Sequence, residues 1–183
     1  MRISRLIHTI GMNLQKTAGG RGRYLKKHNI MAGVGEGVIF QPRMIPLYPE
    51  LIKIHNNVTI GAGVRLVTHD AIHKVLNRLN EGSFPEMIGC IEIMDNVFVG
   101  TNATIMPNVR IGSNVVIGAN SLVNKDCEPN SVYAGSPARR VGSFEDLVRK
   151  RKAGNYATAS KNQSLTQEEQ AAAWAYFHKF REE

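Results

Sequence analysis

The sequence has few of the residues that build disulfide scaffolds, metal clusters or membrane spans. Its 183 residues include only two cysteines, Cys90 and Cys127, without the CxxC spacing of a thiolate metal site. No apolar run reaches the length of a signal peptide core or of a transmembrane helix. A chain of this length suits one domain with terminal appendages. We therefore expect a protein of the reducing cytoplasm, either soluble or peripheral at the inner membrane face.

Acidic residues are also in short supply. The chain has 23 Lys and Arg against 15 Asp and Glu, a formal net charge of +8. Such a charge favours an anionic partner, whether nucleic acid, anionic lipid or a phosphorylated cofactor. The basic residues are scattered and lack the interleaved aromatic residues of a nucleic-acid platform, which argues against nucleic acid.

What the sequence does contain is a six-residue rhythm. From Ile93 the chain divides into IMDNVF, VGTNAT, IMPNVR, IGSNVV, IGANSL and VNKDCE. The first position is always Ile or Val, the fifth is small, and Gly or Asn recurs where a chain must turn. The register is also visible in IHNNVT from Ile54, IGAGVR from Ile60 and, more weakly, VGEGVI from Val34. This period fits neither an amphipathic helix nor a hairpin sheet, and it predicts a solenoid with three units in each coil.

The rhythm is interrupted once. Leu66 is the last first-position residue before the break, and Ile93 restarts the clean register. We expect an extruded loop at about 67–90, which opens with the residues THDAIH. A tolerated surface insertion would explain such a loop, but long loops in compact domains are often functional. Imidazole can accept a proton near neutral pH, so His69 at the edge of a coil could activate a hydroxyl group.

These motifs resemble those of a known family. The hexapeptides, together with THDAIH, IGANSLVNKD and NSVYAGSPARRVG, are similar to the hexapeptide-repeat acyltransferases, and most of all to their maltose, galactoside and polysaccharide O-acetyltransferase branch. The resemblance implies an all-β solenoid, a left-handed parallel β-helix with one extruded loop and helical appendages at both ends. It implies a helical, basic segment at 1–29, the β-helix acyltransferase domain at 30–142 and a helical extension at 143–183.

The resemblance also implies a site that transfers acetyl from acetyl-CoA to a sugar hydroxyl. His69 falls on the general-base histidine of the family, and Asp70 is expected either to orient the imidazole or to cap the loop. The implied coenzyme A contacts are Phe98 near the thioester, backbone groups of Thr101 and Ala119 for pantetheine, and Lys125, Arg139 and Arg140 for phosphate and adenine. Each has a plainer explanation: packing for the aromatic ring, corner geometry for the small residues, and solvated surface charge for the bases.

Some positions depart from the family pattern. Lys74 and Val75 stand where the family often has an aromatic residue, so the family's contacts with the acceptor are not simply expected here. Asn124 stands where the family commonly has Thr. His73 is expected to line the acceptor pocket or to pack. His55 is expected to vary a corner without a chemical role.

Direct transfer without an acyl-enzyme is implied, within a homotrimer. In that arrangement His69 of one chain faces an acetyl group held by the repeats 93–128 of a neighbour. The acceptor is expected to be a capsule, lipopolysaccharide or exopolysaccharide precursor, or alternatively an antibiotic or other xenobiotic.

A metal-dependent enzyme and a non-catalytic scaffold are the two other classes of function for a solenoid of this kind. A metal-dependent protein like the γ-class carbonic anhydrases would need three converging histidines. After His69 and His73 the next histidine is His178 in the tail, so no metal is expected. A non-catalytic scaffold would have no need of the THDAIH loop.

Helices are expected at both ends of the chain. Aliphatic residues with helical spacing and basic neighbours open the chain, and we expect this segment to dock on the solenoid in preference to touching anionic lipid. SFEDLVRKR predicts a short helix capped by Ser143. Thr166 and Glu169 predict a capping box for a second helix. The opening aliphatic residues are Ile3, Leu6, Ile7, Ile10 and Leu14.

Overall fold

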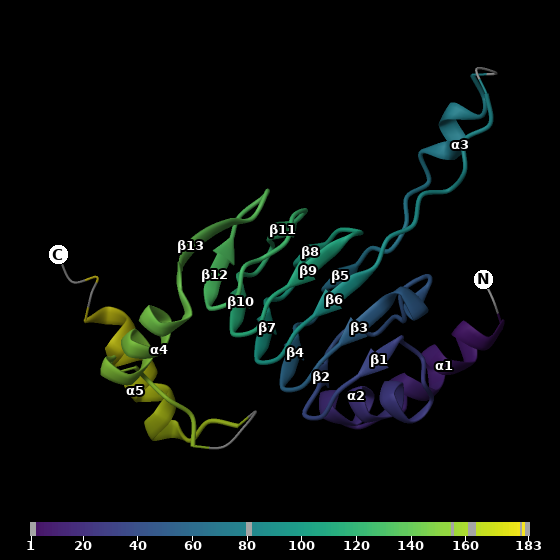
Figure 1. The fold of residues 1–183 in the computed structure, drawn as a ribbon. Helices are drawn as coiled ribbons and strands as arrows, with labels where there is room; N and C mark the ends of the chain where they lie inside the picture. The colour runs from purple at the N-terminus through teal and green to yellow at the C-terminus, as the bar shows by residue number, and fades with distance from the viewer. Residues whose placement is uncertain (1–2, 80–81, 155, 161–163, 180, 182–183) are drawn as a thin grey trace. The chain divides into compact units, whose positions relative to one another are not determined.

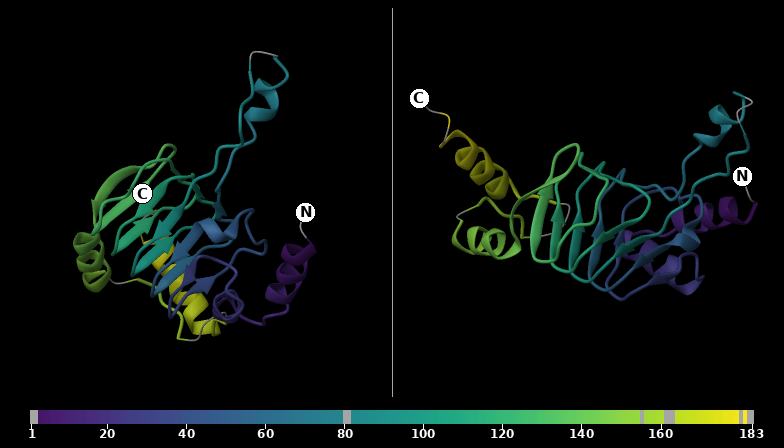
Figure 2. Two further views of the ribbon diagram at one scale, coloured as in Figure 1. Left: turned by 45° about the vertical axis from the view of Figure 1, so that its right-hand side comes forward. Right: turned by 45° about the horizontal axis from the view of Figure 1, so that its top comes forward.

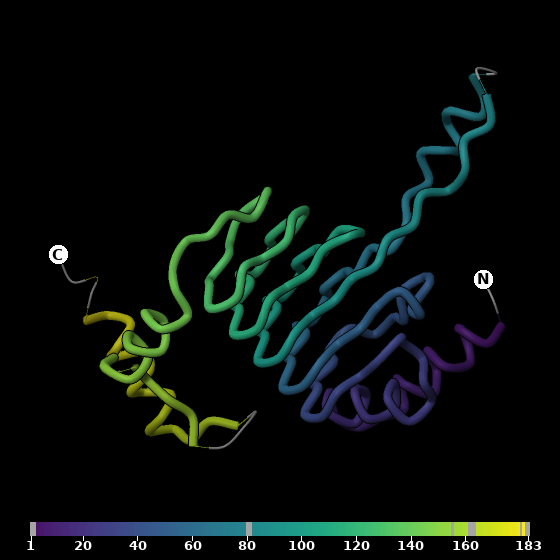
Figure 3. Tube along the Cα trace, in the orientation of Figure 1, coloured from purple at the N-terminus to yellow at the C-terminus, as the bar shows by residue number. Residues whose placement is uncertain are grey.

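The repeats wind into a parallel β-helix in the computed structural model, which describes residues 3–79, 82–154, 156–160, 164–179 and 181 (Figure 1). The chain divides into two compact units, Met1–Leu147 and Val148–Glu183. The coils follow one another along the first unit, as the tube in Figure 3 makes plain. The predicted solenoid of short strands and corners is confirmed.

Three sheets form the sides of the coil, and we call them sheets A, B and C. Sheet A contains β1 (Gly33–Val34), β3 (Ile52–Ile54), β6 (Ile91–Ile93) and β9 (Val109–Ile111) in that order. Sheet B runs through β2 (Ile39–Phe40), β4 (Val58–Ile60), β7 (Val97–Val99), β10 (Val115–Ile117), β12 (Ser131–Ala134) and β13 (Arg139–Ser143). Sheet C contains β5 (Arg65–Leu66), β8 (Thr104–Ile105) and β11 (Leu122–Val123).

The core is a column of stacked aliphatic side chains. Residues at the first position of successive repeats pair in register, so that Ile54 lies against Ile93 and Ile93 against Ile111. Each of these three is at most 1% exposed. Burying an Ile side chain contributes roughly 1.5–3 kcal/mol to stability, so the branched residue at every sixth position accounts for much of the fold.

Asparagine turns one corner of the coil. Asn57, Asn96 and Asn114 stand at the fourth position of their repeats with φ of 53°, 60° and 58°, in the left-handed region that Asn tolerates better than most residues. Their side chains also form a ladder. The amide nitrogen of Asn57 donates to Asn96 (2.8 Å), that of Asn96 to Asn114 (3.0 Å), and that of Asn114 to Asn130 (2.8 Å). The same residue therefore bends the chain and joins neighbouring coils.

The expected register is wrong in the last repeat. Cutting the sequence as VNKDCE puts Cys127 at a fifth position, yet Cys127 bridges to Ile111, a first-position residue. The backbone N–H of Gly112 donates to the Cys127 carbonyl (2.9 Å), and Asn130 continues the asparagine ladder. The unit that begins at Val123 is thus two residues short. The pairing of β12 with β10 fixes this register, since Ser131 lies opposite Val115.

The expected loop at 67–90 is a two-legged arm. His69 and Ile88 form an antiparallel bridge between the legs, the Asp70 N–H donates to the Met87 carbonyl (3.1 Å), and the Gly89 N–H donates to the Thr68 carbonyl (2.8 Å). The arm carries α3 (His73–Leu76), and its legs run side by side in both views of Figure 2. His69 therefore lies at the root of the arm, where the first leg leaves the coil.

Two helices and a short 3-10 turn occupy the start of the chain. They are α1 (Ile3–Asn13), α2 (Ala18–Lys27) and η1 (Pro49–Leu51). Helix α2 packs on β1 and β2, where Leu25 is fully buried and Arg21 Nε donates to the Phe40 carbonyl (2.8 Å). Helix α1 docks on α2, but its aliphatic stripe faces solvent and only Met12 is fully buried. The opening segment was expected to dock on the solenoid, and α1 does so through α2 and through Asn13, which donates to the Arg43 carbonyl, with its aliphatic residues left exposed.

The carboxyl-terminal region contains α4 (Phe144–Ala153) and α5 (Gln167–His178). Ser143 Oγ accepts from the Asp146 N–H (3.0 Å), as expected of a cap. The predicted capping box is present, because Thr166 accepts from the Glu169 N–H while the Glu169 carboxylate accepts from the Thr166 N–H. Hydrogen bonds from Ser160 and Thr166 lower the pKa of Glu169 to about 2. Among the described helices none is long and apolar enough to cross a membrane.

Candidate active site

His69 is held at the root of the arm, three residues beyond β5. Its ring is partly buried, and Nδ1 is enclosed without a hydrogen-bond partner among the described residues. The preceding residue, Thr68, is only 1% exposed, and its hydroxyl donates to the Leu47 carbonyl. The first leg of the arm is therefore anchored directly beside the imidazole. A fixed imidazole at the edge of a coil is suited to accept a proton from a substrate hydroxyl group.

Tyr48 is the neighbour of His69 that sequence reasoning missed. The two rings meet edge to face with centroids 5.5 Å apart. The Tyr48 hydroxyl donates to Glu86 Oε2 (2.8 Å) on the returning leg of the arm. With φ of 50° and ψ of 56°, Tyr48 has a left-handed backbone that is uncommon for a bulky residue and often found at functional sites. It lies outside every hexapeptide, so the rhythm gives no signal of its position.

Asp70 and His73 continue the arm. Asp70 Oδ1 accepts from the backbone N–H of Ile72 (3.0 Å). Of the two roles expected for Asp70, orienting the imidazole or capping the loop, this contact is the loop cap. His73 opens α3 with a partly buried ring, and its Nδ1 is also enclosed without a partner in the described part of the chain. The arm therefore presents two imidazoles, of which only His69 lies next to the coil.

The expected thioester and pantetheine contacts lie on sheet B and at the corner between sheets B and C. Phe98, in the middle of β7, is 46% exposed. Thr101 and Ala119 follow β7 and β10 on successive coils, and both are exposed. A Cβ on Gly100 would lie 2.5 Å from the Ala119 nitrogen, so only glycine permits the coils to approach this closely. The Thr101 carbonyl already accepts from the Asn120 N–H on the next coil (2.9 Å).

The three expected phosphate contacts come together. Lys125, Arg139 and Arg140 line one pocket of about 280 Å³, with Asn124 and Tyr133 among the other walls. Arg140 Nε donates to Ser131 Oγ (3.1 Å), and Arg139 Nη1 donates to the Ala138 carbonyl (2.9 Å). The short unit after Val123 forms one side of the pocket. Three cationic side chains around one hollow favour an anionic ligand.

The two halves of the expected site occupy different corners of the coil. His69 comes after β5, whereas Thr101 precedes β8 and Ala119 precedes β11, and these three strands are neighbours in sheet C. Because the strands are parallel, the histidine and the two corner residues lie at opposite ends of this sheet. The fold brings the basic residues together in one pocket, and one of them, Lys125, follows β11 at the same end of sheet C as His69 but two coils away.

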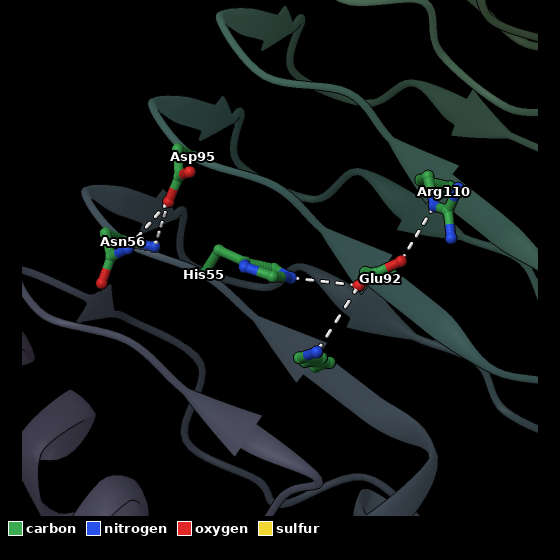
Figure 4. Close-up of polar contacts among 6 residues, drawn as sticks. His55, Asn56, Glu92, Asp95 and Arg110 are labelled. Carbon is green, nitrogen blue, oxygen red and sulfur yellow. Dashed lines mark hydrogen bonds and ion pairs between the residues drawn. The ribbon is translucent and has the colours of Figure 1, made fainter.

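A second polar cluster cross-links the coils at sheet A (Figure 4). Glu92 accepts from Arg110 Nε (2.8 Å), its other oxygen lies 3.0 Å from His55 Nε2, and Lys53 Nζ is 3.9 Å away. The hydrogen bond with His55 is the main reason that the pKa of Glu92 lies below its usual range. No group of three or more His, Cys, Asp or Glu side chains with metal-binding geometry occurs among the described residues.

Comparison with known proteins is consistent with this architecture. Residues 91–125 match the family model "Bacterial transferase hexapeptide (six repeats)". Protein CapG of Staphylococcus aureus is 42% identical over 99 residues, which are 53% of this chain and 55% of CapG. The chain spans about half the length of the first curated relatives it matches.

Two solved structures of similar topology cover more of the chain. A maltose O-acetyltransferase from Clostridium difficile 630 has a TM-score of 0.60 and 26% identity over 78% of this chain and 85% of that one. A galactoside acetyltransferase in complex with coenzyme A has a TM-score of 0.60 and 25% identity over 91% of this chain and 88% of that one. With its stacked hexapeptides, its three parallel sheets and these matches, the chain is similar to the hexapeptide-repeat acyltransferases, and in particular to a maltose O-acetyltransferase and a galactoside acetyltransferase.

Proposed function

We propose that the protein is an acetyl-CoA-dependent O-acetyltransferase that acts on a sugar hydroxyl. The observation that carries the proposal is the imidazole of His69, held at the root of the arm where the first leg is anchored to the coil. The similarity to hexapeptide-repeat acetyltransferases supports acetyl transfer, and the similar structure of a galactoside acetyltransferase in complex with coenzyme A supports this co-substrate. The acceptor we infer is a precursor of a capsule, lipopolysaccharide or exopolysaccharide.

The chemistry is a direct transfer. His69 accepts the hydroxyl proton while the acceptor oxygen forms a bond to the acetyl carbonyl carbon, and the carbon–sulfur bond then breaks. The proton passes from the imidazole to the departing thiolate, so that the products are the acetyl ester and free coenzyme A. Backbone N–H groups stabilise the negative oxygen of the intermediate. An acyl-enzyme on Cys127 is disfavoured, because burial raises the pKa of that thiol to about 12.

Coenzyme A would bind along the repeats after residue 93. Lys125, Arg139 and Arg140 supply cationic groups for its phosphates and adenine end, and the shared pocket supports this role. The exposed residues Thr101 and Ala119 would contact pantetheine, with Phe98 near the thioester. The proposed phosphate site therefore makes use of the shortened unit after Val123.

The working unit we infer is a homotrimer of the cytoplasm. His69 and the corner residues Thr101 and Ala119 lie at opposite ends of sheet C, so a neighbouring chain is needed to close a cleft around both substrates. A threefold axis makes three equivalent clefts from one interface. The two cysteines are free, and Cys90 is exposed, which suits a reducing compartment.

The test is an acceptor screen that follows release of the coenzyme A thiol. With an active acceptor, His69→Ala should lower kcat by roughly 10²- to 10⁴-fold and change the KM for acetyl-CoA little. His178→Ala in α5 is the matched control and should keep the parent kcat. Circular dichroism verifies that each variant is folded. A folded His69→Ala enzyme with near-parent turnover would contradict the proposal.

A further inference from the structure

Helix α1 turns its hydrophobic side toward solvent. Five aliphatic residues at the start of the chain are between 43% and 76% exposed. At 100° per residue, their positions fall within an arc of about 100° on a helical wheel. Met12 lies on the opposite side of the wheel and is fully buried. The five exposed residues are Ile3, Leu6, Ile7, Ile10 and Leu14, and we call them the α1 stripe.

Contacts made by residues outside the stripe fix this orientation. Asn13 Nδ2 donates to the Arg43 carbonyl (2.7 Å), and His8 Nδ1 lies 3.3 Å from the Tyr24 hydroxyl in α2. Gly11 also packs closely on Tyr24, since a Cβ there would lie 2.2 Å from the Tyr24 hydroxyl oxygen. A surface helix normally packs its apolar stripe on the core and exposes its polar face. Here the arrangement is reversed, so the stripe is free to meet something outside the subunit.

The charge around the stripe indicates the nature of that partner. Residues 1–35 contain seven Lys and Arg and no Asp or Glu, and the first acidic residue is Glu36. Arg21 is buried against the Phe40 carbonyl, and Lys26 is paired with Glu36. Lys16, Arg23 and Lys27 are exposed. The first 35 residues thus carry a formal charge of +7, almost the whole net charge of +8, and three of their cations are exposed.

We propose that α1 lies on a bilayer that contains anionic lipid. The α1 stripe would enter the boundary between headgroups and acyl chains, while Lys16, Arg23 and Lys27 meet the anionic headgroups. A second copy of this chain is a poorer occupant, because its own stripe is surrounded by the same positive charge. The proposal does not depend on the acetyl acceptor or on the catalytic role of His69.

The experiment is co-sedimentation of the full chain with vesicles. The protein should bind vesicles of phosphatidylcholine mixed with phosphatidylglycerol. Its affinity for vesicles of phosphatidylcholine alone should be lower by roughly tenfold or more. The double variant Ile7→Asp/Ile10→Asp should lose binding by roughly tenfold or more. The matched control is Ile72→Asp/Val75→Asp on the arm, where the two side chains are 59% and 62% exposed, and it should bind like the parent.

A second variant separates charge from apolar contact. Arg23→Glu/Lys27→Glu should bind the mixed vesicles more weakly and should reduce the dependence of binding on salt. Equal binding to both vesicle types, or full binding by a folded Ile7→Asp/Ile10→Asp variant, overturns the proposal. It is overturned as well if the parent does not sediment with the mixed vesicles. In that case a change of oligomeric state in the aspartate pair, measured by light scattering, would assign the stripe to a second copy.

Discussion

The imidazole of His69 meets the phenol ring of Tyr48 edge to face, with 5.5 Å between the ring centroids and an interplanar angle of 86°. Through its hydroxyl, the same tyrosine holds Glu86 on the returning leg of the arm. One side chain therefore restrains both the proposed base and the second leg of the arm beside it. Tyr48 is a positioning residue on this account, since it acts through His69.

Replacement of Tyr48 should separate these two restraints. Tyr48→Phe keeps the ring against His69 and loses a hydrogen bond worth about 1 kcal/mol, so kcat should fall only several-fold. Tyr48→Ala frees the imidazole, and kcat should fall roughly tenfold or more with little change in the KM for acetyl-CoA. The pH profile of kcat should shift in the alanine variant and not in the phenylalanine variant. Parent values of kcat and pH profile in Tyr48→Ala would contradict a positioning role.

The basic pocket makes a prediction about the 3′-phosphate of coenzyme A. Arg139→Ala/Arg140→Ala should raise the KM for acetyl-CoA by roughly tenfold, because two cationic donors are lost. The loss should be much smaller with the 3′-dephospho form as co-substrate. Arg78→Ala on the arm removes an exposed arginine far along the chain from the pocket and is the control. If the pair of substitutions weakens both co-substrates equally, the arginines do not contact that phosphate.

A cleft shared between subunits predicts complementation. Chains with His69→Ala and chains with Arg139→Ala/Arg140→Ala should each have low activity at limiting acetyl-CoA. When the two are unfolded and refolded together, some clefts receive an intact half from each parent, and activity should rise above that of either parent refolded alone. Light scattering should give the mass of a trimer. A fully active monomer would rule out the shared cleft.

Asparagine at the fourth position should matter in two separable ways. Asn96→Ala loses the ladder contacts to Asn57 and Asn114 and places an alanine at φ of 60°, so the free energy of unfolding should fall by about 2–3 kcal/mol. Asn96→Gly loses the same contacts without the steric penalty, so the free energy of unfolding should fall by only about 1–2 kcal/mol. Urea unfolding monitored by circular dichroism measures both. Equal losses would show that the left-handed backbone costs alanine nothing here.

The fold could be predicted because its determinants are local and repeated. A branched residue such as Ile93 or Ile111 is buried at the first position of each repeat, and Asn or Gly turns the corner. Each hexapeptide therefore predicts the same local structure independently of the others. The short unit after Val123 could not be read in this way. Its register depends on the pairing of Ser131 with Val115 on the neighbouring coil, and the residues of one hexapeptide do not indicate that contact.

The candidate site was predictable only in part. The broken rhythm and the motif THDAIH lead to His69, and three basic residues assigned to one ligand do line one pocket. Tyr48 could not be found, because it belongs to no repeat and reaches His69 through the fold. The spacing of Ile7 and Ile10 likewise predicts an apolar stripe but not the side to which it faces, which depends on Met12 and Asn13 packing against other segments.

The two ends of the β-helix decide whether the molecule can grow. A stack of parallel coils leaves a row of unpaired backbone groups at each end, and such edges recruit further chains into fibres. Helix α2 covers the first coil, where Gly22 approaches the Val38 carbonyl so closely that a Cβ would lie 2.1 Å from its oxygen. At the other end β13 pairs antiparallel with β12, so an incoming parallel coil finds no strand of matching direction in sheet B. The antiparallel strand β13 therefore stops the β-helix from extending into a fibre at this end.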